Sequence, residues 1–195
     1  MNVLASTDLP TSHGSFRFIA FGQSGDEHPH VALHRPQAGD VVDVRIHSEC
    51  MTGDVFGSLK CDCGPQLNAA LDRFGSGGGI LIYLRQEGRG IGLVEKMKAY
   101  ELQASGWDTL DANLQLGHGA DERSYEAAVW LLSELGVERV RLHSNNPDKV
   151  AALNEAGIEV VERVPLETTI APENEQYLKT KRDRMGHIFE DLLND

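Results

Sequence analysis

The stretch GPQLNAALDRFGSGGGILIYL, residues 64–84, decides the fold class. Its first half carries apolar residues at helical spacing, namely Leu67, Ala70, Leu71 and Phe74. This spacing predicts a helix, and the glycine-rich tract at 75–79 predicts its end. The apolar run at 79–84 then predicts a buried strand, so that one helix leads directly into one strand.

Helices and strands continue to alternate after this stretch. Helical spacing returns in three segments, residues 91–103, 121–136 and 145–157. The last segment has Pro147 near its start and Gly157 at its end, an arrangement typical of helices. Two further strands are predicted, at 138–144 and 158–164.

The chain before residue 48 predicts β-structure instead. Three strands are expected there, at residues 15–22, 30–35 and 40–47. We therefore predict an α/β fold, with a mixed sheet that has an antiparallel β element in its N-terminal part and helices packed around it. We expect residues 1–195 to form one domain, with 173–195 as a C-terminal helical tail.

Thirty acidic and eighteen basic residues give the chain a net charge of -12. This charge disfavours nucleic acids as partners, but a few arginines gathered in one cleft can still bind a small anion. No apolar run approaches the roughly 18 residues of a membrane-spanning helix, and the start MNVLASTDLP lacks the features of a secretion signal. We therefore expect a cytoplasmic protein with no membrane partner.

The three cysteines of the chain are confined to one segment, as Cys50, Cys61 and Cys63. An odd number of thiols in a reducing compartment argues against a disulfide framework, and thiolate sulfur suits zinc. Structural zinc sites close four protein ligands, whereas catalytic sites keep three and leave one position open. Three thiols fit the open kind. Two alternatives stay open: ordinary buried thiols, or a closed structural site completed by His47.

A glycine-rich turn lies in IYLRQEGRGIGL, residues 82–93, between a predicted strand and a predicted helix. This arrangement directs backbone N–H groups at an anion. Gly88, Gly90 and Gly92 run G-x-G-x-G, so the turn matches neither a dinucleotide fingerprint nor a Walker A loop. A nucleotide would therefore be held by side chains such as Arg89, unless the turn is a plain connection with solvated charges.

Four segments together carry a resemblance to a known family. They are RIHSECMTGDVFGSLKCDCGPQL (45–67), YLRQEGRGIGL (83–93), DERSY (121–125) and SNNPDKV (144–150). In this order they resemble GTP cyclohydrolase II of riboflavin biosynthesis, over about residues 14–189. Two positions depart from the family pattern: Lys60, where Arg is common, and His118, where an apolar residue is common. Neither position bears on the expected chemistry.

The resemblance implies a zinc-dependent hydrolase that opens the imidazole ring of GTP. The reaction releases formate and diphosphate, and it leaves 2,5-diamino-6-(5-phosphoribosylamino)pyrimidin-4(3H)-one as the first step of riboflavin biosynthesis. The resemblance also implies one zinc ion per subunit, magnesium with the triphosphate, and a homodimer. Alternatives are a relative on the same scaffold that takes another nucleotide or stops after one hydrolytic step, and a non-catalytic zinc-stabilised binding module.

The resemblance also implies roles for individual residues. The zinc ligands would be Cys50, Cys61 and Cys63. The nucleotide contacts would be Arg45, Ile46, His47, Ser48, Glu49, Gln66, Glu87, Gly88, Arg89, Thr109, Ser144 and Lys149. The catalytic residues would be Asp121 as proton acceptor, Arg123 as nucleophile, and Tyr100. An arginine is too basic to act as a nucleophile without a base beside it, and Asp121 is that base.

Asp121 and Arg123 are two residues apart, so they share no helix face. Both reach one site only from a loop or from the first turn of a helix. We expect Asp121 at the N-cap of the helix in 121–136 and Arg123 in its opening turn. The alternative is that Asp121 only caps this helix and that Arg123 is solvated. For His28, His30, His34 and His118 we expect no part in metal binding.

Overall fold

The computed structural model describes residues 1–119, 121–166 and 172–189. Its strands are β1 (Asn2–Thr11), β2 (Gly14–Gly22), β3 (His30–Arg35), β4 (Val41–Ser48), β5 (Gly79–Leu84), β6 (Arg139–His143) and β7 (Glu159–Val164). Its helices are α1 (Met51–Asp54), α2 (Cys63–Gly77), the 3-10 turn η1 (Glu87–Gly90), α3 (Leu93–Ala104), α4 (Thr109–Gln115), α5 (Glu126–Glu134), α6 (Pro147–Glu155) and α7 (Glu175–Met185). No helix in these ranges is long and apolar enough to cross a membrane.

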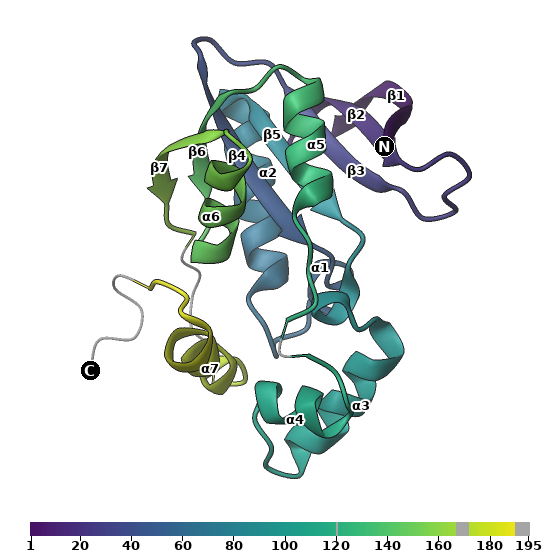
Figure 1. Ribbon diagram of the computed structural model, residues 1–195, viewed down its shortest axis with the longest axis vertical. Coiled ribbons are helices and arrows are strands. Elements are labelled where there is room, and N and C mark those ends of the chain that lie inside the picture. The colour runs from purple at the N-terminus through teal and green to yellow at the C-terminus, as the bar shows by residue number, and fades with distance from the viewer. Residues whose placement is uncertain (120, 167–171, 190–195) are drawn as a thin grey trace.

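The strands form one mixed sheet in the order β1-β2-β3-β5-β4-β6-β7. Strands β1, β2, β3 and β5 pair antiparallel, whereas β5, β4, β6 and β7 pair parallel. The predicted mixed sheet with an antiparallel N-terminal part is therefore confirmed. Strand β4 follows β3 in the sequence but lies between β5 and β6, in the centre of the parallel half. Helices cover this half on both faces, as parallel sheets require (Figure 1).

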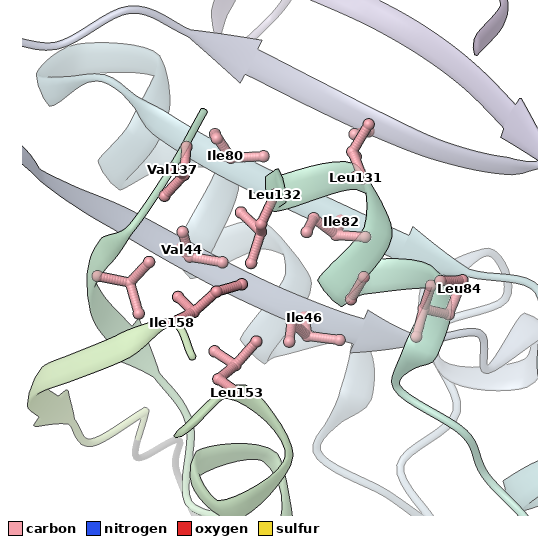
Figure 2. Close-up of a cluster of buried hydrophobic side chains, with 14 of the residues drawn as sticks. Val44, Ile46, Ile80, Ile82, Leu84, Leu131, Leu132, Val137, Leu153 and Ile158 are labelled. Carbon is pink, nitrogen blue, oxygen red and sulfur yellow. The ribbon is translucent and has the colours of Figure 1, made fainter. Parts of the chain in front are cut away.

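The main hydrophobic core lies between the parallel strands and helices α5 and α6. Leu131 and Leu132 of α5 are fully buried in this cluster, and Leu132 points toward Ile80 and Ile82 of β5 (Figure 2). Leu153 of α6 packs beside Ile46 of β4 in the same cluster (Figure 2). Alternate residues of β5 point the other way, because side chains alternate along a strand. The second face is therefore free for α2.

Helix α2 covers the other face of the sheet. Phe74 and Ala70 of this helix pack with Leu81 of β5 and Phe16 of β2, and all four are buried. The helix runs through the first glycines of the predicted stop signal, and Gly78 ends it with a φ of 87°. A left-handed residue at this position is a common way for a helix to end, and glycine adopts it without strain.

One predicted helix start is wrong, and one strand was not predicted. Helix α5 begins at Glu126 with Tyr125 at its N-cap, so Asp121 caps no helix and Arg123 lies in no helical turn. Both residues instead lie in the loop that precedes the helix. Strand β1 was not expected, because nearly all its residues are exposed and a strand without a buried face has no apolar alternation.

The parallel strands place three functional segments at one edge of the sheet. Strand β4 ends at Ser48 next to the cysteine segment, and β5 ends at Leu84 just before the glycine-rich turn. Strand β6 ends at His143, where the segment Ser144–Asn146 begins. Because parallel strands present their carboxyl ends at the same edge, these segments surround one cleft, the usual ligand position in such sheets.

Candidate active site

The cleft at this edge brings together most of the residues that the sequence predicts as a site. Predicted residues that line it are Arg45, His47, Ser48, Glu49, Cys50, Cys61, Cys63, Gln66, Glu87, Gly88, Arg89, Tyr100, Arg123, Ser144 and Lys149. Three predicted residues are not among its lining side chains. The side chain of Ile46 packs in the hydrophobic core. Asp121 does not line the cleft itself but pairs with Arg123, which does. The side chain of Thr109 lies outside the described part of the chain.

The three thiols form a compact group. Their Sγ atoms all lie within 4.8 Å of one another, and those of Cys50 and Cys61 are 3.6 Å apart. Zinc–sulfur bonds of about 2.3 Å in a tetrahedron separate two sulfurs by about 3.8 Å, so the group fits a zinc ion. A Cβ on Gly53 would lie 2.8 Å from Cys61 Sγ, so the close approach of α1 to the thiols requires glycine.

His47 does not join the thiols. Its Nε2 lies 3.0 Å from Asp54 Oδ1, and its ring stacks on Tyr83. Burial lowers the pKa of His47, so the neutral ring donates its Nε2–H to the carboxylate. Asp54 also accepts the hydroxyl of Tyr83 at 2.8 Å and the N–H of Cys50 at 2.9 Å. Among the described residues, no fourth Cys, His or carboxylate completes the thiol group.

Lys96 was not predicted, although it lies beside the thiols. Its Nζ is 3.1 Å from Cys50 Sγ and 2.8 Å from Glu87 Oε1. Burial lowers the pKa of Lys96, but Glu87 and Cys50 outweigh burial and hold the pKa above its usual value. Glu87 also accepts the N–H of Met51 at 2.7 Å. These contacts join the glycine-rich turn to the cysteine segment.

The thiols themselves are shifted in opposite directions. Hydrogen bonds from the other two thiols, together with the charge of Lys96, hold the pKa of Cys50 far below its usual range. The neighbouring Cys50 raises the pKa of Cys61 to about 11, and it raises the pKa of Cys63 as well. One thiolate beside two thiols is the expected state of such a group without a cation. A bound divalent metal favours all three thiolates.

Asp121 and Arg123 form one ion pair at the rim of the cleft. The Arg123 Nε lies 2.8 Å from Asp121 Oδ1, and its Nη2 donates to Oδ2. Burial raises the pKa of Asp121, but its hydrogen bonds with Arg123 outweigh burial and the pKa lies below the usual value. The segment is tied to the glycine-rich turn, because the Glu122 N–H donates to the Arg89 carbonyl at 3.0 Å. The pair thus reaches the cleft from a loop.

The glycine-rich turn differs from the expectation of free backbone donors. Its Gly88 N–H is bound by the Glu87 carboxylate at 2.7 Å, and the Gly92 N–H by the Glu87 carbonyl at 3.0 Å. Arg89 adopts a φ of 63°, a left-handed conformation that is uncommon for a residue with a side chain. Its two Nη atoms are buried and have no hydrogen-bond partner among the residues that the structure describes. The donors that face the cleft are therefore those of this guanidinium.

Three cations of the cleft lack a carboxylate partner within the described ranges. Arg45 donates to the His143 carbonyl at 3.0 Å and to Gln66 Oε1 at 2.6 Å. Lys149 is buried and donates to the Ile46 carbonyl at 2.7 Å, and burial holds its pKa well below the usual value. Together with Arg89, these groups make the cleft electropositive inside an acidic protein. An anionic ligand would pair with them.

Tyr100 lies on α3 one turn after Lys96. Its ring faces the ammonium groups of Lys60 at 4.9 Å and Lys96 at 5.7 Å. Burial raises the pKa of Tyr100, so the hydroxyl is protonated and can donate a hydrogen bond. The spacing of Lys96 and Tyr100, four residues apart on one helix, is the signal that would have predicted Lys96.

Several lining residues were missed. They are Ile91, Lys96, Ala99, Gln103, Asn113, Asn145, Asn146, Tyr177, Lys181, Met185, His187 and Phe189. Asn145 and Asn146 carried a signal, because they follow a strand and precede a helix in the same way as Ser144. The five residues from 177 to 189 carried none, because a distant helix brings them to the cleft.

Known proteins resemble this chain over most of its length. The model of the GTP cyclohydrolase II family matches residues 2–165. The riboflavin biosynthesis protein RibBA of Parabacteroides distasonis is 51% identical over 188 residues, which cover 95% of this chain and 46% of the relative. The RibBA protein of Salinispora arenicola is 52% identical over 194 residues, 97% of this chain and 46% of the relative.

The chain thus spans less than half the length of these curated relatives. A solved structure, that of the two-domain 3,4-dihydroxy-2-butanone 4-phosphate synthase RibBX from A. baumannii, covers 84% of this chain and 40% of its own at 20% identity. Its TM-score is 0.39, so this similarity supports no conclusion. The family model and the identity to the relatives are decisive: the chain belongs to the GTP cyclohydrolase II family.

Proposed function

We propose that this chain opens the imidazole ring of GTP. It releases formate and diphosphate, and it leaves 2,5-diamino-6-(5-phosphoribosylamino)pyrimidin-4(3H)-one as the first step of riboflavin biosynthesis. The observation that carries the proposal is one cleft that holds both an open group of three thiols and three cations for which the described part of the chain offers no carboxylate partner. A purine triphosphate needs both: cations for its phosphates and a hydrolytic centre for its ring.

Cys50, Cys61 and Cys63, which line the cleft, would hold one zinc ion per subunit. Bound there, zinc supplies Lewis acidity that lowers the pKa of a water from 15.7 to about 7. Arg89 and Lys149 would bind the triphosphate together with magnesium, and Arg45 would orient the nucleotide through Gln66.

The other predicted contacts take roles that their geometry supports. His47 holds its Nε2–H on Asp54, so its Nδ1 can accept a hydrogen bond from the nucleotide. The Glu49 carboxylate pairs with Arg85 at 3.3 Å, and it would accept hydrogen bonds from N–H groups of the base. The remaining contacts of the proposal are Ile46 through its carbonyl, Ser48, Glu87, Gly88, Thr109 and Ser144.

The pair of Asp121 and Arg123 would release diphosphate. For Arg123 to attack, Asp121 must take a guanidinium proton, and the 2.8 Å contact allows that transfer. A nitrogen of Arg123 then bonds to the α-phosphorus as the bond from this phosphorus to the bridging oxygen of diphosphate breaks. Water afterwards breaks the phosphorus–nitrogen bond, which leaves the phosphate on the nucleotide and returns a proton to the arginine. Tyr100 would donate a hydrogen bond near the reacting ring.

The proposal also covers the setting of the reaction. Free thiols persist in a reducing compartment, which supports a cytoplasmic location. We further propose that residues 1–195 act as one domain and that the chain works as a homodimer. Of the expected C-terminal helical tail 173–195, α7 is the helix that the structure describes, and residues 190–195 lie outside the described part of the chain. Neither nucleic acid nor membrane is a partner in this proposal.

Incubation of the zinc-loaded protein with GTP tests the function. Formate and diphosphate are followed separately, and we expect one of each for every GTP consumed. ATP is the matched control, and it should give neither product. Release of diphosphate without formate would point instead to a relative that stops before the ring opens. Absence of both products would contradict the proposal.

A further inference from the structure

Helix α7 forms one wall of the cleft, although more than a hundred residues separate it from the cysteine segment. Tyr177, Lys181 and Met185 of this helix line the cleft, and His187 and Phe189 follow just after it. Figure 1 shows α7 beyond the carboxyl edge of the sheet, near α4. The family model ends at residue 165, so α7 lies outside the segment that the model matches.

Lys181 is the firmest contact between α7 and the rest of the site. Its Nζ lies 2.8 Å from Asp62 Oδ1, and the two side chains are 11% and 1% exposed. Asp62 stands between Cys61 and Cys63 in the sequence. A buried carboxylate at this position needs a partner, because an unpaired buried charge is strongly destabilising. Lys181 therefore sets the position of the loop that carries two of the thiols.

The same carboxylate continues the network toward the nucleotide cations. Asp62 Oδ2 accepts the Gln66 amide at 2.7 Å, and Gln66 Oε1 accepts the Arg45 guanidinium at 2.6 Å. An amide held in this way has its oxygen fixed toward Arg45. One chain of hydrogen bonds thus runs from α7 through the cysteine loop to a cation of the cleft.

Tyr177 gives α7 a second contact with the site. Its ring centroid lies 4.5 Å from Lys181 Nζ and 5.8 Å from Arg89 Cζ. The described residues give the buried Nη atoms of Arg89 no hydrogen-bond partner, so the face of the Tyr177 ring is a contact that helps to keep this guanidinium in place. The helix thus touches both the thiol loop and the glycine-rich turn.

The surrounding chain holds α7 in this position. The Asn145 side chain binds the backbone of Leu166 on both sides, with Oδ1 accepting at 3.0 Å and Nδ2 donating at 2.8 Å. The backbone carbonyl of Asn145 accepts the N–H of Ile188 at 2.9 Å. Arg184 pairs with Asp108 and with Asp111 of α4. Segments on both sides of the helix are therefore fixed to the cleft.

We propose that α7 helps to form the metal and nucleotide site and that Lys181 is a positioning residue. By pairing with Asp62 it holds the loop of Cys61 and Cys63 in the geometry that binds the metal, and it holds Gln66 and Arg45 in the geometry that binds the nucleotide. The part that concerns the nucleotide rests on the proposed function. The part that concerns the thiols stands without it.

The experiment measures how fast zinc-loaded protein loses zinc to a chelating dye. Lys181→Met removes the charge but keeps the length of the side chain, and we expect zinc to leave at least tenfold faster. Lys179→Met is the matched control, because Lys179 pairs with Glu175 on the exposed face of the same helix. Zinc release from this variant should stay within twofold of the unchanged protein.

Coupling between the two partners gives a second readout. In Lys181→Met the Asp62 carboxylate keeps its hydrogen bond from Gln66 but loses the buried lysine charge, so this variant is the one at risk of misfolding. The double variant with Asp62→Asn removes both charges, and it should fold and still lose zinc at least fivefold faster than the unchanged protein. Circular dichroism checks the fold of each variant.

Three outcomes separate the two proposals. A protein that binds zinc but does not open GTP contradicts the proposed function, while zinc release still tests Lys181. A folded double variant that keeps zinc as long as the unchanged protein overturns the role of Lys181, whether or not the protein opens GTP. A protein that binds no zinc overturns both. With GTP turnover intact, Lys181→Met should also raise KM at least fivefold, whereas Lys179→Met should leave it unchanged.

Discussion

Cys63→Ser is expected to abolish the release of formate from GTP. Cys63 opens α2 and faces the other two thiols, and a serine hydroxyl is a poor zinc ligand at neutral pH. A catalytic metal contributes several kcal/mol of transition-state stabilisation, and each 1.36 kcal/mol is a factor of ten in rate. We therefore expect a loss of about a thousandfold or more, measured as formate per GTP.

The control for Cys63→Ser is Leu59→Ala in the same loop. Leu59 is 60% exposed, and its truncation should leave formate release within about twofold of the unchanged value. Metal analysis should find zinc in this control and little in Cys63→Ser. A serine variant that still opens the ring at the original rate would remove the thiol group from the mechanism.

Asp121→Asn is expected to give the second large loss. The amide keeps the shape of the carboxylate and can still accept a hydrogen bond from Arg123, but it cannot take a proton. General bases contribute about a hundredfold to ten-thousandfold in rate, so diphosphate release should fall by this factor. The affinity for GTP should change little, because Arg89 and Lys149 remain in place.

Glu122→Gln is the matched control for Asp121→Asn. Glu122 is the neighbouring carboxylate, and its side chain accepts the N–H of Gly119 without lining the cleft. The glutamine should keep diphosphate release within about twofold of the original rate. If both variants lost diphosphate release equally, the loss would come from a disturbed loop and not from removal of a general base at Asp121.

The sequence predicted the parallel half of the fold well, because its signals are local. The helix and strand of residues 63–84 are joined by glycines that stop one and start the other, and burial on both faces makes the strand continuously apolar. Strand β1 escaped prediction because it buries neither face. The start of α5 was misplaced because Asp121 has the residue type of an N-cap, yet its carboxylate pairs with Arg123.

The contrast between local sequence signals and contacts made by distant segments also explains which site residues could be predicted. The thiols were predictable as a group, because two of them are separated by a single residue and the third follows a strand. The lysine contacts were not, because Lys96 and Lys181 reach the cysteine loop from two helices that are far away in the sequence. Only the folded chain shows that each carries a buried ion pair. Periodicity indicates which face of a helix is apolar, not which distant carboxylate a lysine meets.

The central claim is that three thiols and one open position hold a zinc ion at the cleft. X-ray absorption at the zinc edge of the metal-loaded protein tests it most directly. The account predicts three sulfur neighbours at about 2.3 Å and one lighter oxygen atom. Addition of GTP should change the oxygen shell and leave the sulfur shell intact. A histidine nitrogen in the fourth position, or fewer than three sulfurs, would contradict it.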